Sequence, residues 1–357
     1  MTMLLREHVP LAPLTTLGLG GPARYFRECA SEAELRETLA LAGERGTRVQ
    51  IIGGGSNVVF ADTGFPGLVV KVAIGGVAVR DGADGVEVTA GAGVEWDALV
   101  RETVERGWTG IECLSGIPGT VGATPIQNVG AYGQEIADTL VSVACLERER
   151  LAGVVFTRDE CELAYRDSRF KRRDRDRYVV LDVTLRLRRG ATPRLRYAEL
   201  EQAVRQRGRL DALDTGDAVR IVRDTVLELR RRKSMVLDPA DPNARSVGSF
   251  FVNPVLSGEA FAELAGRWRA SGGSDPIPTF PADGRVKVPA AWLVEHAGFA
   301  KGHRHGGAGI STRHALALVN LGGTAAELLA LAESIERAVQ ARFGIRLQRE
   351  PVVVEVL

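Results

Sequence analysis

Cysteine is scarce in this chain, which has four cysteines among 357 residues. Cys29, Cys113, Cys145 and Cys161 are widely scattered, with neither a C-x-x-C pair nor the paired spacing of a disulfide framework. We therefore expect reduced thiols in the protein core.

Excess charge and long apolar runs are also missing. The net charge is +1, so no overall field draws the chain to nucleic acid or to a membrane. No segment reaches the ~20 apolar residues of a membrane-spanning helix. The N-terminal MTMLLREHVPLAPLTT lacks the apolar core and the cleavage site of a signal peptide. These absences predict a cytoplasmic protein with no nucleic-acid or membrane partner, and the length predicts two or three domains.

The two familiar phosphate-binding glycine motifs, G-x-G-x-x-G and G-x-x-x-x-G-K-[ST], do not occur. Two other glycine-rich segments are present, IGGGSNVVF at 52–60 and SGIPGTVGATPIQNVGAYG at 115–133. Glycine lets a ligand approach main-chain N–H groups directly. A single glycine cluster is more often a surface turn. Two clusters, both rich in Ser, Thr, Asn and Gln, instead predict a site for a dinucleotide-sized ligand.

No metal site is predicted. His303 and His305 lie close together in KGHRHGGAG, and His314 follows. No carboxylate or cysteine stands at ligand spacing beside them, so we interpret this segment as an exposed polar loop.

The apolar pattern predicts both helices and strands. The capping boxes Ser31/Glu34 and Thr324/Glu327 predict two helix starts. Apolar spacing predicts further helices over 96–105 and from 217 onward, and strands at 49–52, 69–72, 77–79, 86–88, 178–188 and 351–357. The segment 237–246, which is rich in turn formers, predicts a domain boundary or a crossing loop.

Three short motifs combine reactive side chains with turn residues: YRDSRFK at 165–171, GSFFVNP at 248–254 and QREP at 348–351. Taken singly, Arg166 fits a surface ion pair, Ser249 a turn hydroxyl and Glu350 a strand-edge charge. Together with the two glycine-rich segments, they indicate a catalytic site.

From about Leu11 to its C-terminus, the chain resembles the UDP-N-acetylenolpyruvoylglucosamine reductase family. The resemblance is carried by TTLGLGGPA, IGGGSNVVF, IPGTVGATPIQNVGAYG, YRDSRFK, KSMVLDP, GSFFVNP, GRVKVPAAWLVEHAGFAKG and QREP, in this order. RYAELE, which holds Tyr197, resembles the tyrosine loop of the family's longer subgroup.

The resemblance implies an α+β fold. Its FAD-binding unit has two subdomains and is similar to the vanillyl-alcohol-oxidase/PCMH type, and a C-terminal α+β substrate-binding domain follows. We expect residues 1–73 and the terminal strand within 344–357 to form the first FAD-binding subdomain. Residues 74–232 then form the second subdomain, and residues 233–343 form the substrate-binding domain. The terminal strand would thereby bring Glu350 back to the flavin unit.

The resemblance also implies a reaction. The family moves a hydride from NADPH to FAD and on to the enolpyruvyl group of UDP-N-acetylglucosamine enolpyruvate, which gives UDP-N-acetylmuramate for peptidoglycan. Arg166 and Glu350 match the residues that stabilise the enolate-like intermediate, and Ser249 matches the proton donor. A guanidinium can grip a carboxylate bidentately, whereas a carboxyl group helps only if it is protonated or acts through water.

Further contacts follow from the same resemblance. The FAD contacts are Gly53, Gly54, Gly55, Ser56, Asn57, Ile117, Pro118, Gly119, Gly122, Thr124, Asn128, Gly130 and Tyr132. Tyr197 would close over the substrate's diphosphate, and Asn253 and Lys301 would contact the substrate or the nicotinamide. Val252 and His296 replace a lysine and a glutamine of some relatives, so no phosphate or carboxylate contact is carried over to them. A monomer is expected by family analogy.

Two other functions stay open at this point. An FAD-dependent oxidase of an alcohol or hydroxy acid, on the same broad fold, would be reduced by its organic substrate and would need no NADPH. A protein that only binds nucleotide sugar or stores flavin would show no turnover, but it would not need a proton donor beside a charge clamp.

Overall fold

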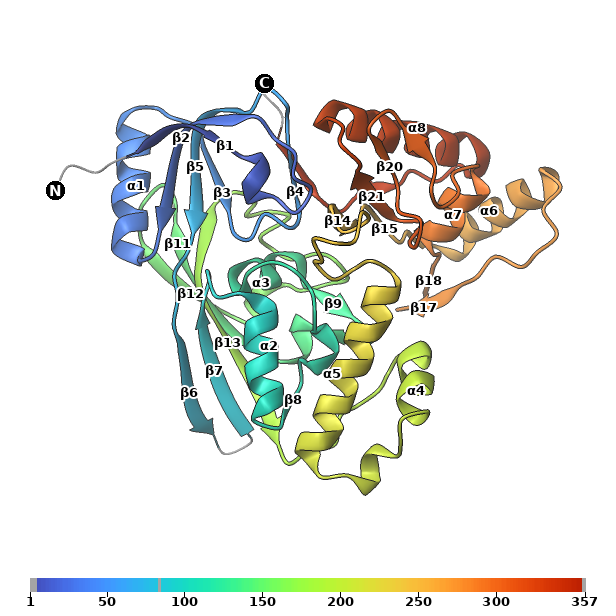
Figure 1. Cartoon of the computed structure of the whole chain (residues 1–357), viewed down its shortest axis with the longest axis horizontal. Helices are drawn as coiled ribbons and strands as arrows, with labels where there is room; N and C mark the ends of the chain where they lie inside the picture. Colours follow the sequence, from blue (N-terminus) through green and yellow to red (C-terminus); the bar gives the residue numbers. More distant parts are fainter. Residues whose placement is uncertain (1–4, 83–84, 355–357) are drawn as a thin grey trace. The chain divides into compact units, whose positions relative to one another are not determined.

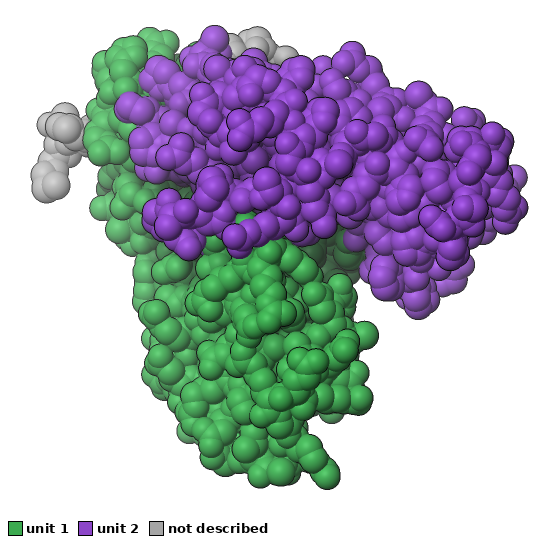
Figure 2. Space-filling model, turned by 45° about the vertical axis from the view of Figure 1, so that its right-hand side comes forward, with its two compact units in different colours: residues 1–9, 23–55, 65–236 green, residues 10–22, 56–64, 237–357 purple. Residues whose placement is uncertain are grey.

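The computed structural model describes residues 5–82 and 85–354, which form two compact units. Unit 1 comprises residues 1–9, 23–55 and 65–236, and unit 2 comprises residues 10–22, 56–64 and 237–357. Figure 1 traces the elements, and Figure 2 shows unit 1 in green and unit 2 in purple. The predicted turn-rich boundary coincides with the main change of unit, which falls between Val236 and Leu237.

Unit 1 contains the α-helices and strands up to residue 232, apart from β4 and the end residues Pro10 of β1 and Pro22 of β2. The helices are α1 Glu32–Glu44, α2 Trp96–Glu105, α3 Thr124–Gln127, α4 Ala198–Arg205 and α5 Thr215–Arg232. The strands are β1 Arg6–Pro10, β2 Pro22–Cys29, β3 Val49–Ile52, β5 Phe65–Val72, β6 Val77–Gly82, β7 Gly85–Gly91, β8 Trp108–Thr109, β9 Gly130–Ala131, β10 Gln134–Glu135, β11 Leu140–Glu147, β12 Gly153–Thr157 and β13 Tyr178–Arg189.

The first sheet of unit 1 has the strand order β1-β2-β5-β3, with β2 and β3 both parallel to β5. Helix α1 follows β2 in the chain and leads into β3, as a parallel arrangement requires. The Ser31 hydroxyl accepts a hydrogen bond from the Glu34 N–H (3.2 Å), and the Glu34 carboxylate accepts one from the Ala30 N–H (2.7 Å). These two contacts confirm the predicted helix start.

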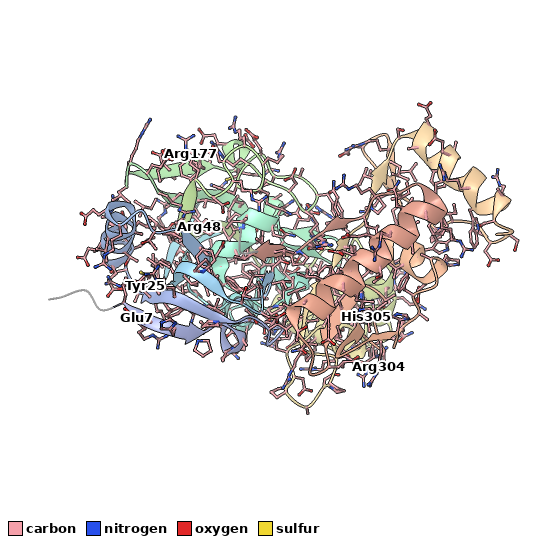
Figure 3. The ribbon with its side chains drawn as sticks, turned by 90° about the horizontal axis from the view of Figure 1, so that it is seen from above. Glu7, Tyr25, Arg48, Arg177, Arg304 and His305 are labelled. Carbon is pink, nitrogen blue, oxygen red and sulfur yellow. The ribbon has the colours of Figure 1, made fainter. Side chains whose placement is uncertain are left out.

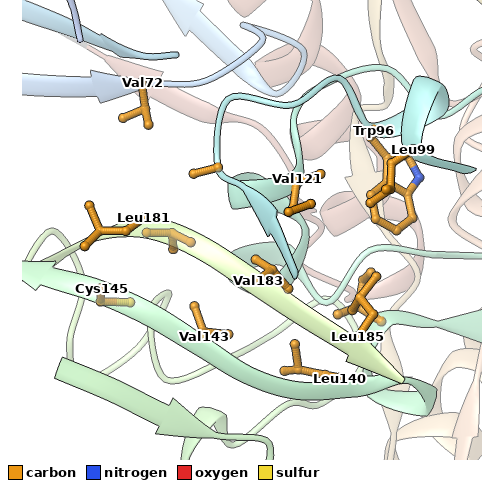
Figure 4. Close-up of a cluster of buried hydrophobic side chains, with 14 of the residues drawn as sticks. Val72, Trp96, Leu99, Val121, Leu140, Val143, Cys145, Leu181, Val183 and Leu185 are labelled. Atoms are coloured by element: carbon orange, nitrogen blue, oxygen red, sulfur yellow. The ribbon is translucent and has the colours of Figure 1, made fainter. Parts of the chain in front are cut away.

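The second sheet of unit 1 is antiparallel, with the order β12-β11-β13-β7-β6. Its strand β13 confirms the alternation predicted for 178–188, because Val183, Leu185 and Leu187 are buried. Helix α2 has the predicted bounds, and Trp96 and Leu99 join the same apolar core (Figure 4). This core fixes the start of α2, and the start of α2 in turn holds the second glycine-rich segment.

Unit 2 contains the remaining elements. The helices are α6 Gly258–Ala270, α7 Ala290–His296 and α8 Ala325–Phe343. The strands are β4 Val58–Phe60, β14 Ser246–Ser249, β15 Phe251–Val252, β16 Val255–Leu256, β17 Phe280–Ala282, β18 Arg285–Lys287, β19 Arg304–His305, β20 Ala308–Ile310, β21 Ala317–Asn320, β22 Gln348–Arg349 and β23 Val352–Val354.

The main sheet of unit 2 has the order β14-β21-β20-β19 and is antiparallel. Helix α8 packs on β20 and β21, and its start carries both hydrogen bonds of the predicted Thr324/Glu327 capping box. The edge strand β19 presents the exposed Arg304 and His305 (Figure 3). The centroids of the His303 and Phe299 rings lie 5.0 Å apart. The described residues include no group of three or more His, Cys, Asp or Glu side chains that could hold a metal ion.

The predicted terminal strand forms as β23, which runs parallel to β4 with Val352 opposite Val58. Both strands belong to unit 2, although the sequence prediction assigned 58–60 to the first FAD-binding subdomain. Residues 355–357 of the predicted strand lie outside the described residues. The division into 1–73 with 344–357, 74–232 and 233–343 stays a prediction.

All four cysteines are buried and free, as the sequence predicts. Burial raises the pKa of each thiol, and that of Cys161 rises to about 12. Across 5–82 and 85–354, the helices are too short or too polar to cross a bilayer.

Candidate active site

The two glycine-rich segments touch each other inside unit 1. Strand β3 ends at Ile52, and the turn that follows brings Gly54 against Gly119. A Cβ atom on Gly54 would lie 2.8 Å from the Gly119 Cα, and one on Gly53 would collide with the Thr120 hydroxyl. Side chains are therefore excluded from this contact. Gly54 is exposed, so the contact leaves main chain accessible to a ligand.

The start of α2 holds the second segment in place. The Trp96 N–H donates to the Gly119 carbonyl (3.0 Å), and the Trp96 indole N–H donates to the Leu114 carbonyl (3.1 Å). Gly122 packs so closely on Ala92 that a Cβ would lie 3.1 Å from the Ala92 Cα, and its N–H donates to the Ala92 carbonyl (3.0 Å). The predicted residues 117–122 thus have a fixed backbone.

An ion pair that the sequence analysis missed reinforces this segment. The Asp97 carboxylate receives two hydrogen bonds from Arg223, at 2.7 and 2.8 Å, and one from the Gly116 N–H at 2.5 Å. Burial alone would raise the pKa of Asp97, but the bonds from Arg223 and Gly116 outweigh burial and lower it. The sequence does show an acidic residue, Asp97, in the first turn of the predicted 96–105 helix, and this residue could have indicated an ion pair. Its partner, 126 positions away, could not be identified from spacing.

The other end of the segment supports Arg166. Ala164 and Asp167 exchange two main-chain hydrogen bonds of 3.0 Å, so Tyr165 and Arg166 form the tip of a tight turn. Arg166 has a φ of 54°, which costs energy for a residue with a side chain. Its guanidinium donates to the carbonyls of Gly130 (2.6 Å) and Asn128 (3.4 Å). The structure thus brings Arg166 to two of the predicted FAD residues.

Several predicted FAD contacts use their side chains within the protein. Thr124 donates its hydroxyl to the Val121 carbonyl (2.7 Å) and is buried. Asn128 is also buried, and its amide is hydrogen-bonded on both sides. Ile117 and Pro118 are half-buried beside Gly119. Main chain and apolar surface are therefore what this segment offers a cofactor.

Tyr132 and Tyr197 meet edge to face, with ring centroids 5.5 Å apart. Tyr197 immediately precedes α4 and is 40% exposed, whereas burial raises the pKa of Tyr132 to about 12. The Lys233 ammonium lies 5.8 Å from the Tyr132 ring centre and pairs with Glu199 at 2.7 Å. Two predicted residues and one cation thus form a single cluster in unit 1.

In unit 2, the segment that follows Ser249 lies beside the segment that carries Glu350. Phe251 of β15 pairs with Arg349 of β22, and the Glu350 N–H donates to the Phe250 carbonyl (2.9 Å). Asn57 extends this arrangement, because its side-chain amide donates to the Glu350 carbonyl (3.3 Å). The boundary between the units falls between Gly55 and Ser56, so Ser56 and Asn57 belong with Glu350.

The remaining predicted contacts of unit 2 lie around α7. Asn253 accepts a hydrogen bond from the Ala290 N–H (2.8 Å) at the start of that helix. His296, at its end, stacks on Trp292 with ring centroids 4.1 Å apart, which accounts for a histidine at this position. Lys301 is exposed in the loop that follows.

The contact between Gly54 and Gly119 fits a cofactor that contains a diphosphate. Main-chain N–H groups can bind a phosphate at such a closely packed contact, where a side chain would collide with the neighbouring backbone. A family model described as an FAD binding domain matches residues 23–149, which include both glycine-rich segments. The protein is therefore a flavoenzyme, an FAD-dependent oxidoreductase.

A second family model, described as UDP-N-acetylenolpyruvoylglucosamine reductase, C-terminal domain, matches residues 239–354. The chain is 49% identical to the UDP-N-acetylenolpyruvoylglucosamine reductase of Thermobifida fusca, over 100% of this chain and 99% of the relative. The Streptomyces avermitilis enzyme of the same name is 46% identical, over 97% and 94%. The chain belongs to the UDP-N-acetylenolpyruvoylglucosamine reductase family, as the sequence motifs predict.

A solved structure agrees with this assignment. The UDP-N-acetylenolpyruvylglucosamine reductase of Thermus caldophilus matches with a TM-score of 0.64 at 25% identity, over 99% of this chain and 100% of that one. The predicted α+β fold, with an FAD-binding part and a C-terminal domain of this family, is confirmed.

Proposed function

We propose that the protein reduces UDP-N-acetylglucosamine enolpyruvate to UDP-N-acetylmuramate with NADPH, as a cytoplasmic monomer that supplies peptidoglycan precursors. The observation that supports this proposal is the hydrogen bond from the Glu350 N–H to the Phe250 carbonyl, which sets Glu350 beside the residue that follows Ser249 in the chain. The names of relatives that match the whole chain support the choice of substrate. The net charge of +1 supports the expectation that neither nucleic acid nor a membrane is a partner.

FAD, when bound, supplies the hydride that adds to the enolpyruvyl double bond. Negative charge then develops on the neighbouring carbon and spreads into the substrate's carboxylate. Addition to an electron-rich enol ether is unfavourable unless the protein stabilises that charge as it forms.

Arg166 meets this need by binding the carboxylate through its guanidinium. The Gly130 and Asn128 carbonyls that accept hydrogen bonds from it limit its movement before the substrate arrives. A stabiliser of this kind contributes about 3 kcal/mol to lowering the barrier.

Ser249 donates the proton that completes the reduction, and Glu350 stabilises the intermediate while protonated or through a water. A hydroxyl is a weak acid, but it can protonate a strongly basic carbanion and then recover a proton from solvent. Tyr197 closes over the diphosphate, as in the longer subgroup of the family, while Asn253 and Lys301 contact substrate or nicotinamide. Arg166 belongs to unit 1, and Ser249 and Glu350 belong to unit 2.

The test follows NADPH oxidation by the purified, FAD-loaded protein under anaerobic conditions, with and without UDP-N-acetylglucosamine enolpyruvate. We expect multiple turnovers only when that substrate is present. Flavin reduction that stalls with the substrate present would overturn the proposal. Reduction of the flavin by an alcohol or hydroxy acid, with reoxidation by oxygen, would identify an oxidase instead. Substrate binding without flavin reoxidation would identify a binding protein.

A further inference from the structure

The Asn128 side chain connects the second glycine-rich segment to the turn that carries Arg166. Its amide N–H group donates to the Ala164 carbonyl (2.8 Å) and to the Glu135 carboxylate (3.0 Å). Its amide oxygen accepts from the Ala137 N–H (3.1 Å). Both sides of the amide are therefore engaged by the protein, and the residue is 1% exposed.

These contacts reach Arg166 from two directions. Ala164 is the base of the tight turn, so the Asn128 amide holds the turn's main chain. The Asn128 main-chain carbonyl accepts from the Arg166 guanidinium, and so does the carbonyl of Gly130. Asn128 thus contacts the backbone of the Arg166 turn through its side chain, and its main-chain carbonyl joins that of Gly130 in holding the guanidinium.

The Arg166 turn needs such support because its backbone is strained. A φ of 54° for arginine persists only where surrounding contacts hold it. Lys171 supplies a second contact, since its ammonium donates to the Arg166 carbonyl (2.9 Å). Ser168 supplies a third through its hydroxyl bond to the Ile126 carbonyl (2.7 Å). Asn128 differs from these two because it contacts both the turn and the guanidinium.

We propose that the Asn128 side chain is a positioning group for Arg166 rather than a group that contacts FAD, whereas the family resemblance predicts Asn128 only as an FAD contact. A buried amide with these hydrogen bonds would have to break them to reach a cofactor, and each broken bond leaves a buried polar group unpaired. The proposal rests on the proposed function, in which Arg166 binds the substrate's carboxylate. It predicts that loss of the amide impairs the step that uses substrate and spares the binding of FAD.

The test compares two substitutions at this position with one control. Asn128 has a φ of 43°, so Asn128→Gly removes the amide without adding backbone strain. Asn128→Asp keeps the shape and the acceptor but loses the donor to Ala164. Gln134→Leu is the control, because Gln134 is another buried amide nearby, and it accepts from the Cys113 N–H (2.8 Å). Melting temperatures show whether each variant folds.

Three measurements follow for each folded variant: the FAD dissociation constant by fluorescence titration, the rate of flavin reduction by NADPH, and the rate of reoxidation by UDP-N-acetylglucosamine enolpyruvate. For both Asn128 variants we expect unchanged FAD affinity and reduction, but reoxidation about 10- to 100-fold slower, the loss typical of a misplaced catalytic group. In an Arg166→Lys background, Asn128→Gly should add little further loss. Weaker FAD binding with normal reoxidation of the bound flavin would overturn the proposal.

Hydrogen exchange separates this proposal from the proposed function. Peptides that cover 164–168 should exchange faster in Asn128→Gly than in the wild type or in Gln134→Leu, because the turn loses its support. The exchange rate of peptides that cover 53–57 should be the same in all three proteins. If the wild-type enzyme fails to use the substrate, the proposed function fails, and the exchange data still decide the role of Asn128. Unchanged exchange over 164–168 would contradict that role.

Discussion

Gly54 lies directly against Gly119, so that a Cβ on Gly54 would stand 2.8 Å from the Gly119 Cα. The two glycines come from segments that are 65 positions apart, and only a residue without a side chain allows this approach. The contact turns two separate glycine-rich motifs into one continuous surface of main chain. The affinity for FAD should therefore fall if Gly54 gains even one methyl group as a side chain.

We expect Gly54→Ala to raise the FAD dissociation constant by about tenfold or more, since overpacking against backbone costs about 1–3 kcal/mol. Fluorescence titration of the apoprotein with FAD measures this effect. Gly43→Ala is the matched control, because a Cβ at Gly43 in α1 would meet nothing within 4 Å. Equal FAD affinity in both variants would show that the loop contact is dispensable.

Ser249→Ala should separate the two halves of the reaction. The flavin of this variant should be reduced by NADPH at the normal rate, but its reoxidation by the enolpyruvyl substrate should slow by about 100-fold or more, because the proton donor is missing. Stopped-flow absorbance follows both steps. Ser334→Ala, in α8, controls for the loss of a serine hydroxyl in the same unit. Normal rates in both half-reactions would remove Ser249 from the mechanism.

Glu350→Gln tests whether the carboxyl acts as a hydrogen-bond donor. The contacts of Glu350 with Phe250 and Asn57 involve its main chain, so the substitution preserves them. An amide can donate as a protonated carboxyl does, whereas alanine cannot. Glu350→Gln should therefore retain roughly tenfold more of the reoxidation rate than Glu350→Ala. Equal rates in the two variants would show that no donated hydrogen bond is involved.

Much of this fold could be predicted from local sequence patterns. The helix over 96–105, the cap at Ser31 and the alternation along 178–188 depend on neighbouring residues, and the structure confirms them. The same patterns could not reveal that Gly54 meets Gly119, or that Asp97 pairs with Arg223. Such contacts depend on how distant elements pack, and no spacing rule encodes them. For the same reason, the sequence could not show that Asn128 contacts the turn that carries Arg166, and its contact with FAD stays a prediction.

The Asp97–Arg223 ion pair should make stability depend on pH. Hydrogen bonds from Arg223 and Gly116 lower the pKa of Asp97 despite its burial. The stabilisation is therefore fully present above the unfolded-state pKa of about 3.9 and is lost as the pH falls through the lower folded-state value. At pH 7, Asp97→Asn should lower the free energy of unfolding by roughly 2 kcal/mol.

Urea denaturation at several pH values measures this difference, which should shrink as the pH drops below about 4. Glu32→Gln is the control, since Glu32 forms an exposed pair with Arg36 along one helix and should change stability by less than about 0.5 kcal/mol. A difference between Asp97→Asn and the wild type that does not vary with pH would contradict the assignment of this carboxylate.

Glu112 should have the opposite pH dependence, because burial raises its pKa and the bond from the Gly110 N–H (2.6 Å) offsets this only in part. A raised folded-state pKa means that unfolding releases a proton, so this residue costs stability as the pH rises above its unfolded value of about 4.3. Glu112→Gln keeps an acceptor for Gly110 without the ionisable group. We expect it to stabilise the protein at pH 8, by on the order of 1 kcal/mol, and to have little effect at pH 4. Urea denaturation checks this, with the exposed Glu44→Gln as control. A variant that is less stable than the wild type at pH 8 would mean that the fold needs the charge at position 112 despite its burial.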